Sequence, residues 1–350
     1  MSIKEKQNFQ TYQDSSDVKY PTNEKEASSL IKKYYKLNNP LEIIGTGSKR
    51  KIGKRLQCSA TLNLSKLNGI IEYLPEELYI KVKACTPIKD IEEELKKKNQ
   101  QLAFEPVDLG YLLNGSSDFG TAAGQVACNI SGPRRFKVGS VRDHVLGFRG
   151  VNGRGETIKS GGVVVKNVTG YDLCKLMAGS FGTLAALTKV TLKVLPAPEK
   201  IRTVLLFGKT DGEAIKAMSQ AAGSPNEVSA LAHLPNDIAT RSEVSYIREA
   251  GASVTAVRLE GHGPSVEHRT DSLRQLLGKF GQIEELHSHN SSTFWLEVAN
   301  VAPLLPDPES VIWKISVTPS IGANVLKAVR ANGGEGYYDW AGGLIWLAIG

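Results

Sequence analysis

The chain has 350 residues, of which 41% are apolar and 23% are charged, as in globular proteins large enough for two domains. Its apolar runs are far shorter than the roughly 18 residues of a membrane-spanning helix, and its first residues lack the apolar core of a signal peptide. We therefore expect a cytoplasmic protein with no integral membrane segment. The net charge of +7 comes from dispersed lysines and arginines without a nucleic-acid-binding motif, which indicates a solvated basic surface and no nucleic-acid partner.

Neither the cysteines nor the histidines are spaced as metal ligands. The four cysteines contain no C-x-x-C pair, which argues against an iron–sulfur cluster or a zinc site and favours ordinary buried thiols at Cys58, Cys85, Cys128 and Cys174. His287 and His289 have H-x-H spacing, but no pattern supplies a third ligand. We expect a surface loop there and no metal.

The first hundred residues predict an α+β arrangement. Residues 1–21 are polar and are expected to form a flexible tail. Asn23 and Glu26 form a capping box that begins a helix, whose inner face would carry Leu30, Tyr34 and Leu37. Further along, strands are expected at 41–44, 80–84 and 102–106, with a helix whose apolar stripe is Ile88, Ile91 and Leu95.

The first glycine-rich segment, GTGSK, directly follows the strand at 41–44 and consists of Gly45, Thr46, Gly47, Ser48 and Lys49. Such a turn exposes successive backbone N–H groups, which suits a pyrophosphate, and Lys49 and Arg50 add positive charge. A plain β-turn explains the glycines equally well. The segment is not a Rossmann fingerprint, because Arg50 stands where the third glycine would be.

A second segment of small residues spans 120–132. Small side chains let a flat ligand lie against the backbone, and neighbouring polar groups offer hydrogen bonds to ring heteroatoms. The candidates are Gly120, Thr121, Gly124, Gln125, Asn129 and Gly132. A small-residue face for helix packing is the alternative. Arg142 and Asp143 are added as candidates just before a strand at 145–151, which ends in the hairpin turn NGRGE.

The third segment joins a short helix to a strand. Leu173, Leu176 and Met177 have helical spacing, and apolar residues alternate with polar ones over 189–194. The turn between them contributes Gly179, Ser180, Gly182, Thr183 and Leu184 as candidates. One domain thus contains a turn of phosphate size, a small-residue platform and a turn that permits close approach. This combination predicts a bound dinucleotide.

Residues 198–350 predict a second α+β domain. Strands are expected at 201–207, 227–234, 253–261 and 310–317, and helices at 211–222, 266–280 and 322–332. This alternation favours a ferredoxin-like domain that follows the dinucleotide-binding domain at 22–197.

The glycine-rich segments and their spacing resemble a known flavoprotein family. The runs GTGSK, GTAAGQVACNISGPRRFKVGSVRDHVLG and KNVTGYDLCKLMAGSFGTLAALTKVTLKVLP are similar to the PCMH-type FAD-binding domain of the vanillyl-alcohol oxidase and p-cresol methylhydroxylase superfamily. Within it, the sequence resembles the family of glycolate oxidase FAD-binding (E) subunits. The segment YYDWAGGLIWL at 337–347 resembles a further motif of that family, after which relatives usually continue into a helix and a tail, whereas this sequence ends at Gly350.

The resemblance implies where FAD would lie. The pyrophosphate is expected on the loop 45–49, the isoalloxazine and pyrophosphate along 120–132, and the adenosine half against the turn 179–184. The first loop has no histidine of the kind that attaches flavin covalently in some members, so dissociable FAD is expected. No catalytic residue is assigned from the sequence.

The resemblance also implies the reaction and the partners. The flavin would accept two electrons from the α-carbon of glycolate, giving glyoxylate, and pass them on singly. The implied partners are a catalytic flavoprotein subunit and an iron–sulfur subunit, through which any peripheral contact with the inner membrane would be made. Arg134 and Arg135 are candidates to attract a substrate carboxylate or acidic partner residues, with surface solvation as the alternative.

Three other functions fit the same fold. One is a self-sufficient FAD-dependent D-lactate-type 2-hydroxyacid dehydrogenase. Another is a non-catalytic scaffold subunit that retains the fold without flavin. The third is an NADPH-dependent enolpyruvyl reductase, for which the required acidic and serine residues cannot be assigned.

Overall fold

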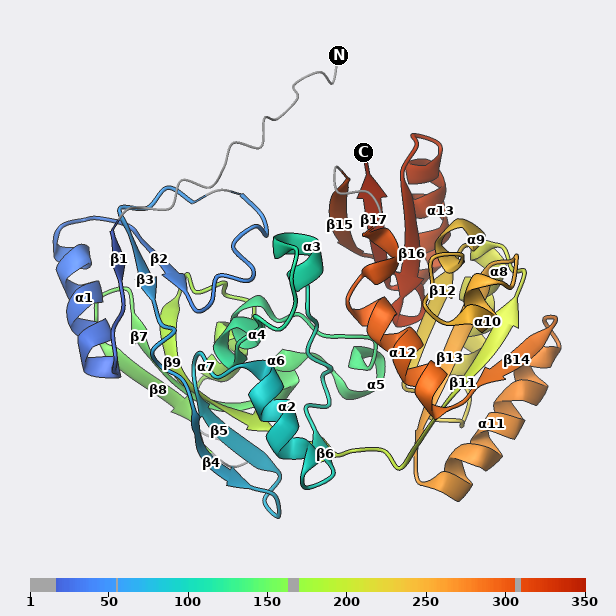
Figure 1. Cartoon of the computed structure of the whole chain (residues 1–350), viewed down its shortest axis with the longest axis horizontal. Helices are drawn as coiled ribbons and strands as arrows, with labels where there is room; N and C mark the ends of the chain where they lie inside the picture. The colour runs from blue at the N-terminus through green and yellow to red at the C-terminus, as the bar shows by residue number, and fades with distance from the viewer. Residues whose placement is uncertain (1–16, 55, 163–169, 306–309) are drawn as a thin grey trace.

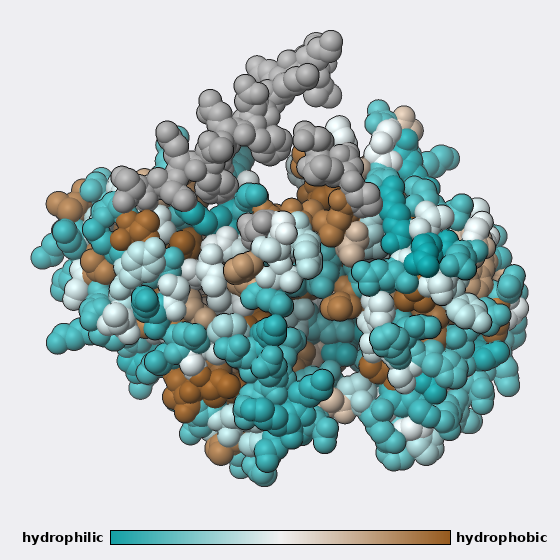
Figure 2. Space-filling view, viewed as in Figure 1, coloured by the Kyte–Doolittle hydropathy of each residue, from teal (hydrophilic) through white to brown (hydrophobic). Residues whose placement is uncertain are grey.

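A computed structural model describes residues 17–54, 56–162, 170–305 and 310–350. The chain forms two α+β domains that lie side by side in Figure 1, with the change from one to the other between strands β10 (Leu195–Pro196) and β11 (Lys200–Phe207). The α+β class is confirmed. Most of the visible surface is hydrophilic, and no helix among the described residues is long and apolar enough to cross a membrane (Figure 2).

The first domain begins with a small parallel sheet of order β1-β3-β2. Its strands are β1 (Val18–Lys19), β2 (Leu41–Ile44) and β3 (Ala60–Asn63), and β1 therefore lies within the expected tail 1–21. Helix α1 (Glu24–Lys36) begins as predicted, because the Asn23 side chain accepts a hydrogen bond from the Glu26 N–H. Its buried residues are Ala27, Ile31 and Tyr34, whereas Leu37 is 57% exposed.

An antiparallel sheet of order β4-β5-β9-β7-β8 completes the first domain. Its strands are β4 (Ile70–Leu74), β5 (Tyr79–Lys83), β7 (Val145–Asn152), β8 (Thr157–Gly161) and β9 (Ala185–Lys193). Short helices connect them: α2 (Ile88–Lys96), α3 (Gly110–Asn114), α4 (Ala122–Cys128), α5 (Arg135–Val138), α6 (Val141–His144) and α7 (Leu173–Met177). Strand β6 (Gln100–Gln101) pairs with β10.

Two further local predictions in this domain are wrong. The apolar run 102–106 is not a strand: Leu102 and Glu105 close a turn, and Phe104 is buried by packing rather than by a sheet. In α7, Leu176 is 54% exposed, while Cys174 and Met177 are buried. Residues 166–169, the beginning of the third glycine-rich segment, lie outside the described residues.

The second domain is one antiparallel sheet of order β14-β11-β13-β12-β16-β17-β15. Its first four strands and two helices form the predicted β-α-β-β-α-β unit: β11, α8 (Asp211–Ala222), β12 (Ala230–Leu234), β13 (Val254–Gly261), α11 (Gly263–Gly278) and β14 (Ile283–Leu286). Strands β15 (Val311–Ser316), β16 (Glu335–Asp339) and β17 (Leu344–Ile349) extend the sheet. The remaining helices are α9 (Asn236–Ala239), α10 (Ser245–Arg248), α12 (Ser288–Ala299) and α13 (Pro319–Arg330), with short 3₁₀ turns η1 (Ala302–Leu304) and η2 (Trp340–Gly342).

The two domains share a hydrophobic cluster and a buried group of charges. Val107, Leu109 and Ile130 of the first domain pack in one cluster with residues of the second-domain sheet. Beside it, Arg134 donates two hydrogen bonds to the Glu260 carboxylate, at 3.0 and 2.8 Å.

The second ion pair of this charged group has its arginine in the second domain and its glutamate in the first. Arg258 of β13 donates to both carboxylate oxygens of Glu105, at 2.7 and 3.0 Å. Burial alone would raise the pKa of Glu260, but Arg258 and Arg134 lower it to about 2. The group therefore stays ionised and joins the domains at neutral pH. Arg134 is thereby engaged within the protein, so its predicted role toward a substrate is wrong.

Removing one member of this buried group should destabilise the protein strongly. We expect Arg134→Met to lower the free energy of unfolding by about 3 kcal/mol, because the Glu260 carboxylate loses two hydrogen bonds in a desolvated site. The matched control is Lys137→Met, which removes a solvent-exposed ion pair to Glu227 and should cost less than about 1 kcal/mol. Urea denaturation of both variants measures the difference, and equal losses would contradict the prediction.

Candidate functional site

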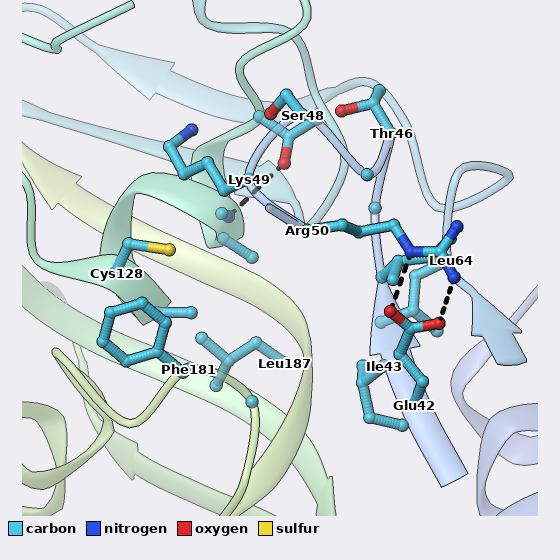
Figure 3. Close-up of a pocket in the computed structure, with 18 of the residues that line it drawn as sticks. Glu42, Ile43, Thr46, Ser48, Lys49, Arg50, Leu64, Cys128, Phe181 and Leu187 are labelled. Atoms are coloured by element: carbon cyan, nitrogen blue, oxygen red, sulfur yellow. Dashed lines mark hydrogen bonds and ion pairs between the residues drawn. The ribbon is translucent and has the colours of Figure 1, made fainter. Parts of the chain in front are cut away.

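A cavity of about 390 Å³ lies in the first domain where all three small-residue segments meet. Its walls come from the loop after β2, from one side of α4 and from the turn before β9 (Figure 3). The predicted residues that line it are Gly45, Thr46, Gly47, Ser48, Lys49, Thr121, Gly124, Gly182 and Thr183. Segments separated by more than 130 residues of sequence thus form one site, as the sequence predicted.

The first loop is seated closely on α4. A Cβ atom at Gly45 would lie 3.1 Å from both the Cys85 sulfur and the Thr121 hydroxyl oxygen, which is tighter than ordinary contact. The Thr46 hydroxyl donates to the Phe119 carbonyl, and Gly47 has a φ of +79°, a conformation that favours glycine. The loop is therefore held in place by contacts that larger residues would prevent.

Three backbone donors of this loop have no hydrogen-bond partner in the described part of the chain. The N–H groups of Thr46, Gly47 and Lys49 donate no hydrogen bond to any of the residues described. Consecutive N–H groups left in this way at a glycine turn form an anion-binding concavity. The loop can therefore accept phosphate oxygens without giving up existing hydrogen bonds.

The two cationic side chains next to this turn differ in whether a carboxylate neutralises them. Arg50 donates to both oxygens of Glu42, at 2.8 and 2.6 Å, and Glu42 also accepts from Thr61. Its charge is therefore compensated within the protein, contrary to the prediction. Lys49 has no carboxylate within ion-pair distance among the described residues, and burial lowers its pKa. An anion in the cavity would stabilise the charge of Lys49.

Helix α4 brings small residues to the opposite wall. The Thr121 hydroxyl caps its first turn by accepting from the Gly124 N–H, and Ala123, Ala127 and Cys128 also line the cavity. Burial raises the pKa of the Cys128 thiol, with Lys49 opposing the shift. Cys128 is therefore a neutral wall residue.

Gln125, at 2% exposed, is buried in the same helix. Its amide nitrogen donates to the Val107 carbonyl, and its amide oxygen is buried without a hydrogen-bond partner in the structure. The side chain lies outside the cavity lining and holds α4 against residue 107.

The turn before β9 forms the third wall and separates a second cavity. Phe181 and Gly182 both have positive φ, and the Phe181 N–H donates to the Ala127 carbonyl, which fixes the turn to α4. The second cavity, of about 410 Å³, lies beyond this turn and is also lined by Leu184. The two cavities share the wall residues Ile43, Gly182, Thr183 and Ala185.

Several predicted residues do not line either cavity: Gly120, Gln125, Asn129, Gly132, Arg142, Asp143, Gly179 and Ser180. Some of them have structural contacts instead. Asn129 accepts from the Arg142 N–H and ends α4 in a left-handed conformation. The Asp143 carboxylate accepts from Ser140 and caps α6.

Sequence reasoning missed the apolar part of the lining. Ile43, Ile52, Leu64 and Leu187 line the cavity together with Phe181 and Cys128. They come from separate segments, and no common sequence signal distinguishes them, since Leu64 is not close to any of the three glycine-rich segments.

The cysteines and histidines match their predictions only partly. Cys85 and Cys174 are buried, whereas Cys58 and Cys128 are partly exposed. His287 and His289 are exposed but do not lie in a loop, since His287 is the residue at the N-cap position of α12, without a side-chain capping hydrogen bond, and His289 lies in the first turn.

Comparisons with known proteins indicate an FAD-binding domain in this chain. A family model described as an FAD binding domain matches residues 16–161. The "Glycolate oxidase subunit GlcE" of Escherichia coli (strain K12) is 33% identical over 311 residues, which cover 88% of this chain and 75% of that protein. A D-lactate dehydrogenase of Anaerostipes hadrus is 34% identical over 145 residues, or 41% of this chain and 29% of the relative.

Solved structures show the same fold. A structure of p-cresol methylhydroxylase with substrate bound superposes with a TM-score of 0.69 at 13% identity, covering 95% of this chain and 74% of that chain. An alkyldihydroxyacetonephosphate synthase gives a TM-score of 0.69 at 16% identity, covering 95% and 70% of the two chains. The chain therefore belongs to the glycolate oxidase FAD-binding subunit family and contains a PCMH-type FAD-binding domain.

Proposed function

We propose that this chain is the FAD-binding subunit of a glycolate oxidase that converts glycolate to glyoxylate. The observation that carries the proposal is the anion-binding turn beside Lys49, at the meeting point of the three small-residue segments. The relative that matches over most of its length is a glycolate oxidase subunit. D-lactate dehydrogenase, the alternative, matches over only 41% of this chain and 29% of its own length.

The proposed position of FAD follows from the residues around the two cavities. The pyrophosphate lies on the N–H groups of Thr46, Gly47 and Lys49, with the Lys49 ammonium as counter-charge. The adenosine half lies toward the turn at 182–184, which borders the second cavity. The isoalloxazine lies on the other side, along α4 and toward the second domain. The remaining candidates of 120–143 do not line the cavities. We propose that they contribute to FAD binding indirectly, by positioning α4 and its neighbours.

Bound flavin supplies two-electron oxidation of a carbon that carries a hydroxyl group. The chain's own residues position it, exclude water with an apolar lining and balance phosphate charge with Lys49. Among the described residues, the lining contains no histidine, which supports a dissociable cofactor. We propose that electrons leave through a second flavoprotein subunit and an iron–sulfur subunit. The matches to two differently named glycolate oxidase subunits support a complex.

Loss of the Lys49 charge should weaken FAD binding. We expect Lys49→Met to raise the FAD dissociation constant at least about tenfold, because a charge-assisted contact to phosphate is lost. Lys51→Met is the matched control, since Lys51 is exposed and does not line the cavity. Fluorescence titration of the apoproteins with FAD measures both, and an unchanged constant for Lys49→Met would refute the role of this residue.

A branched side chain at Gly47 should also weaken FAD binding, because it distorts the turn and not because a charge is lost. Gly47→Val introduces a Cβ atom only 3.1 Å from the Arg50 side chain and strains a turn at φ +79°, so FAD content of the purified protein should fall severalfold. Gly208→Val, at a φ of +68° with open space around it in the second domain, controls for backbone strain alone. Full flavin occupancy in Gly47→Val would argue against the pyrophosphate position.

The complex itself is tested by copurification from the native host. We expect the tagged chain to bring down a flavoprotein and an iron-containing subunit, and the complex to reduce a dye with glycolate. The isolated chain should not reduce the dye with glycolate at a comparable rate. Equal turnover by the isolated chain would favour the self-sufficient dehydrogenase, and a chain that neither binds FAD nor responds to it would favour the scaffold.

A further inference from the structure

The Trp340 indole lies at the boundary between the domains. It begins η2, between β16 and β17, and its Nε1 donates to the Gly132 carbonyl of the first domain at 3.2 Å. Two cations from different domains approach the same ring. The Arg135 guanidinium carbon of α5 lies 4.2 Å from the ring centroid, and the Lys314 ammonium of β15 lies 5.0 Å from it.

Neither cation forms an ion pair with a carboxylate in the described part of the chain. Arg134, the neighbour of Arg135, is bound to Glu260, but among the described residues no carboxylate lies within ion-pair distance of Arg135 or Lys314. Asp339 is the acidic group whose field reaches Lys314, and burial raises its pKa to about 8. At neutral pH it is therefore mostly protonated and provides little compensation. Lys314 is an exposed residue, and partial desolvation of its ammonium together with the charge of Arg135 lowers its pKa.

The indole that these cations share and the cavity of the first domain are connected through one hydrophobic cluster. Ile52 and Cys128, which line that cavity, and Ile312 and Trp340, which neighbour Lys314, all pack against the same hydrophobic cluster between the domains. Hydrophobic side chains also reach the surface over β15 and β17, where Val311 is 42% exposed (Figure 2). The cations lie at the domain boundary, and the isoalloxazine is proposed to extend toward the second domain.

We propose that Lys314 and Arg135 form an anion site at the domain boundary that binds the carboxylate of a small hydroxyacid. Lys314 contacts the carboxylate, and Arg135 adds positive potential from the first domain. The flat indole of Trp340 holds both cations and offers an apolar surface to the carbon atoms of the ligand. This inference rests on the proposed function, because it assigns a substrate contact to the same flavoprotein.

The test measures carboxylate binding directly. The full chain, with and without FAD, is titrated with glycolate and with the neutral analogue glycolamide, and the fluorescence of its tryptophans is recorded. We expect saturable binding of glycolate and not of glycolamide. Lys314→Gln should weaken glycolate binding at least about tenfold and Arg135→Gln about threefold, whereas Lys314→Arg should retain it. FAD content should be unchanged in all variants.

The matched control is Lys327→Gln, which removes one positive charge from the exposed face of α13 and should leave the affinity unchanged. Equal affinity for glycolate in the wild type and Lys314→Gln, equal binding of glycolamide, or no binding by the wild type would each overturn the site. Failure of the proposed function looks different: the chain would take up no FAD, while the Lys314-dependent binding of glycolate would persist.

Discussion

The cavity depends on one close approach, that of the Gly45 backbone to α4 and to the end of β5. A single added methyl group at Gly45 would crowd both Cys85 and Thr121 at 3.1 Å. Because the loop is seated there, the small parallel sheet and the larger antiparallel sheet of the first domain meet along the wall of one cavity. The Phe181 N–H then fastens the third segment to Ala127, and the site is closed on three sides.

The second constraint acts between the domains. A buried carboxylate is tolerated only when positive groups compensate it, and Arg134 and Arg258 each reach across to a glutamate of the other domain. Trp340 adds a hydrogen bond to Gly132 at the same boundary. These contacts place the strands β15 and β17, with Lys314, beside the FAD-binding domain. The same arrangement explains how a cofactor held by the first domain can meet a ligand held partly by the second.

Much of this could be predicted where the sequence signal is local. Helix α8 has the predicted bounds, because the Thr210 and Glu213 capping box and a regular apolar stripe define it. The strand β2 and the loop after it were predicted from apolar residues followed by glycines. The run 102–106 was misassigned because its apolar residues are buried by a turn and not by a sheet.

Features that depend on distant partners were not predictable. Arg134 is bound by a glutamate 126 residues away, and Arg50 is neutralised by Glu42 in a strand whose buried face the sequence does not specify. The convergence of Arg135 and Lys314 on one indole likewise depends on how the domains pack. The glycines marked the site, but the charges that act on it required the fold.

The most direct measurement is the experimental structure of the chain with FAD bound. The account predicts that the pyrophosphate contacts the N–H groups of Thr46 and Gly47 and the Lys49 ammonium, and that the isoalloxazine points toward Trp340. A cofactor bound elsewhere, or a pyrophosphate separated from this loop by protein side chains, would contradict it.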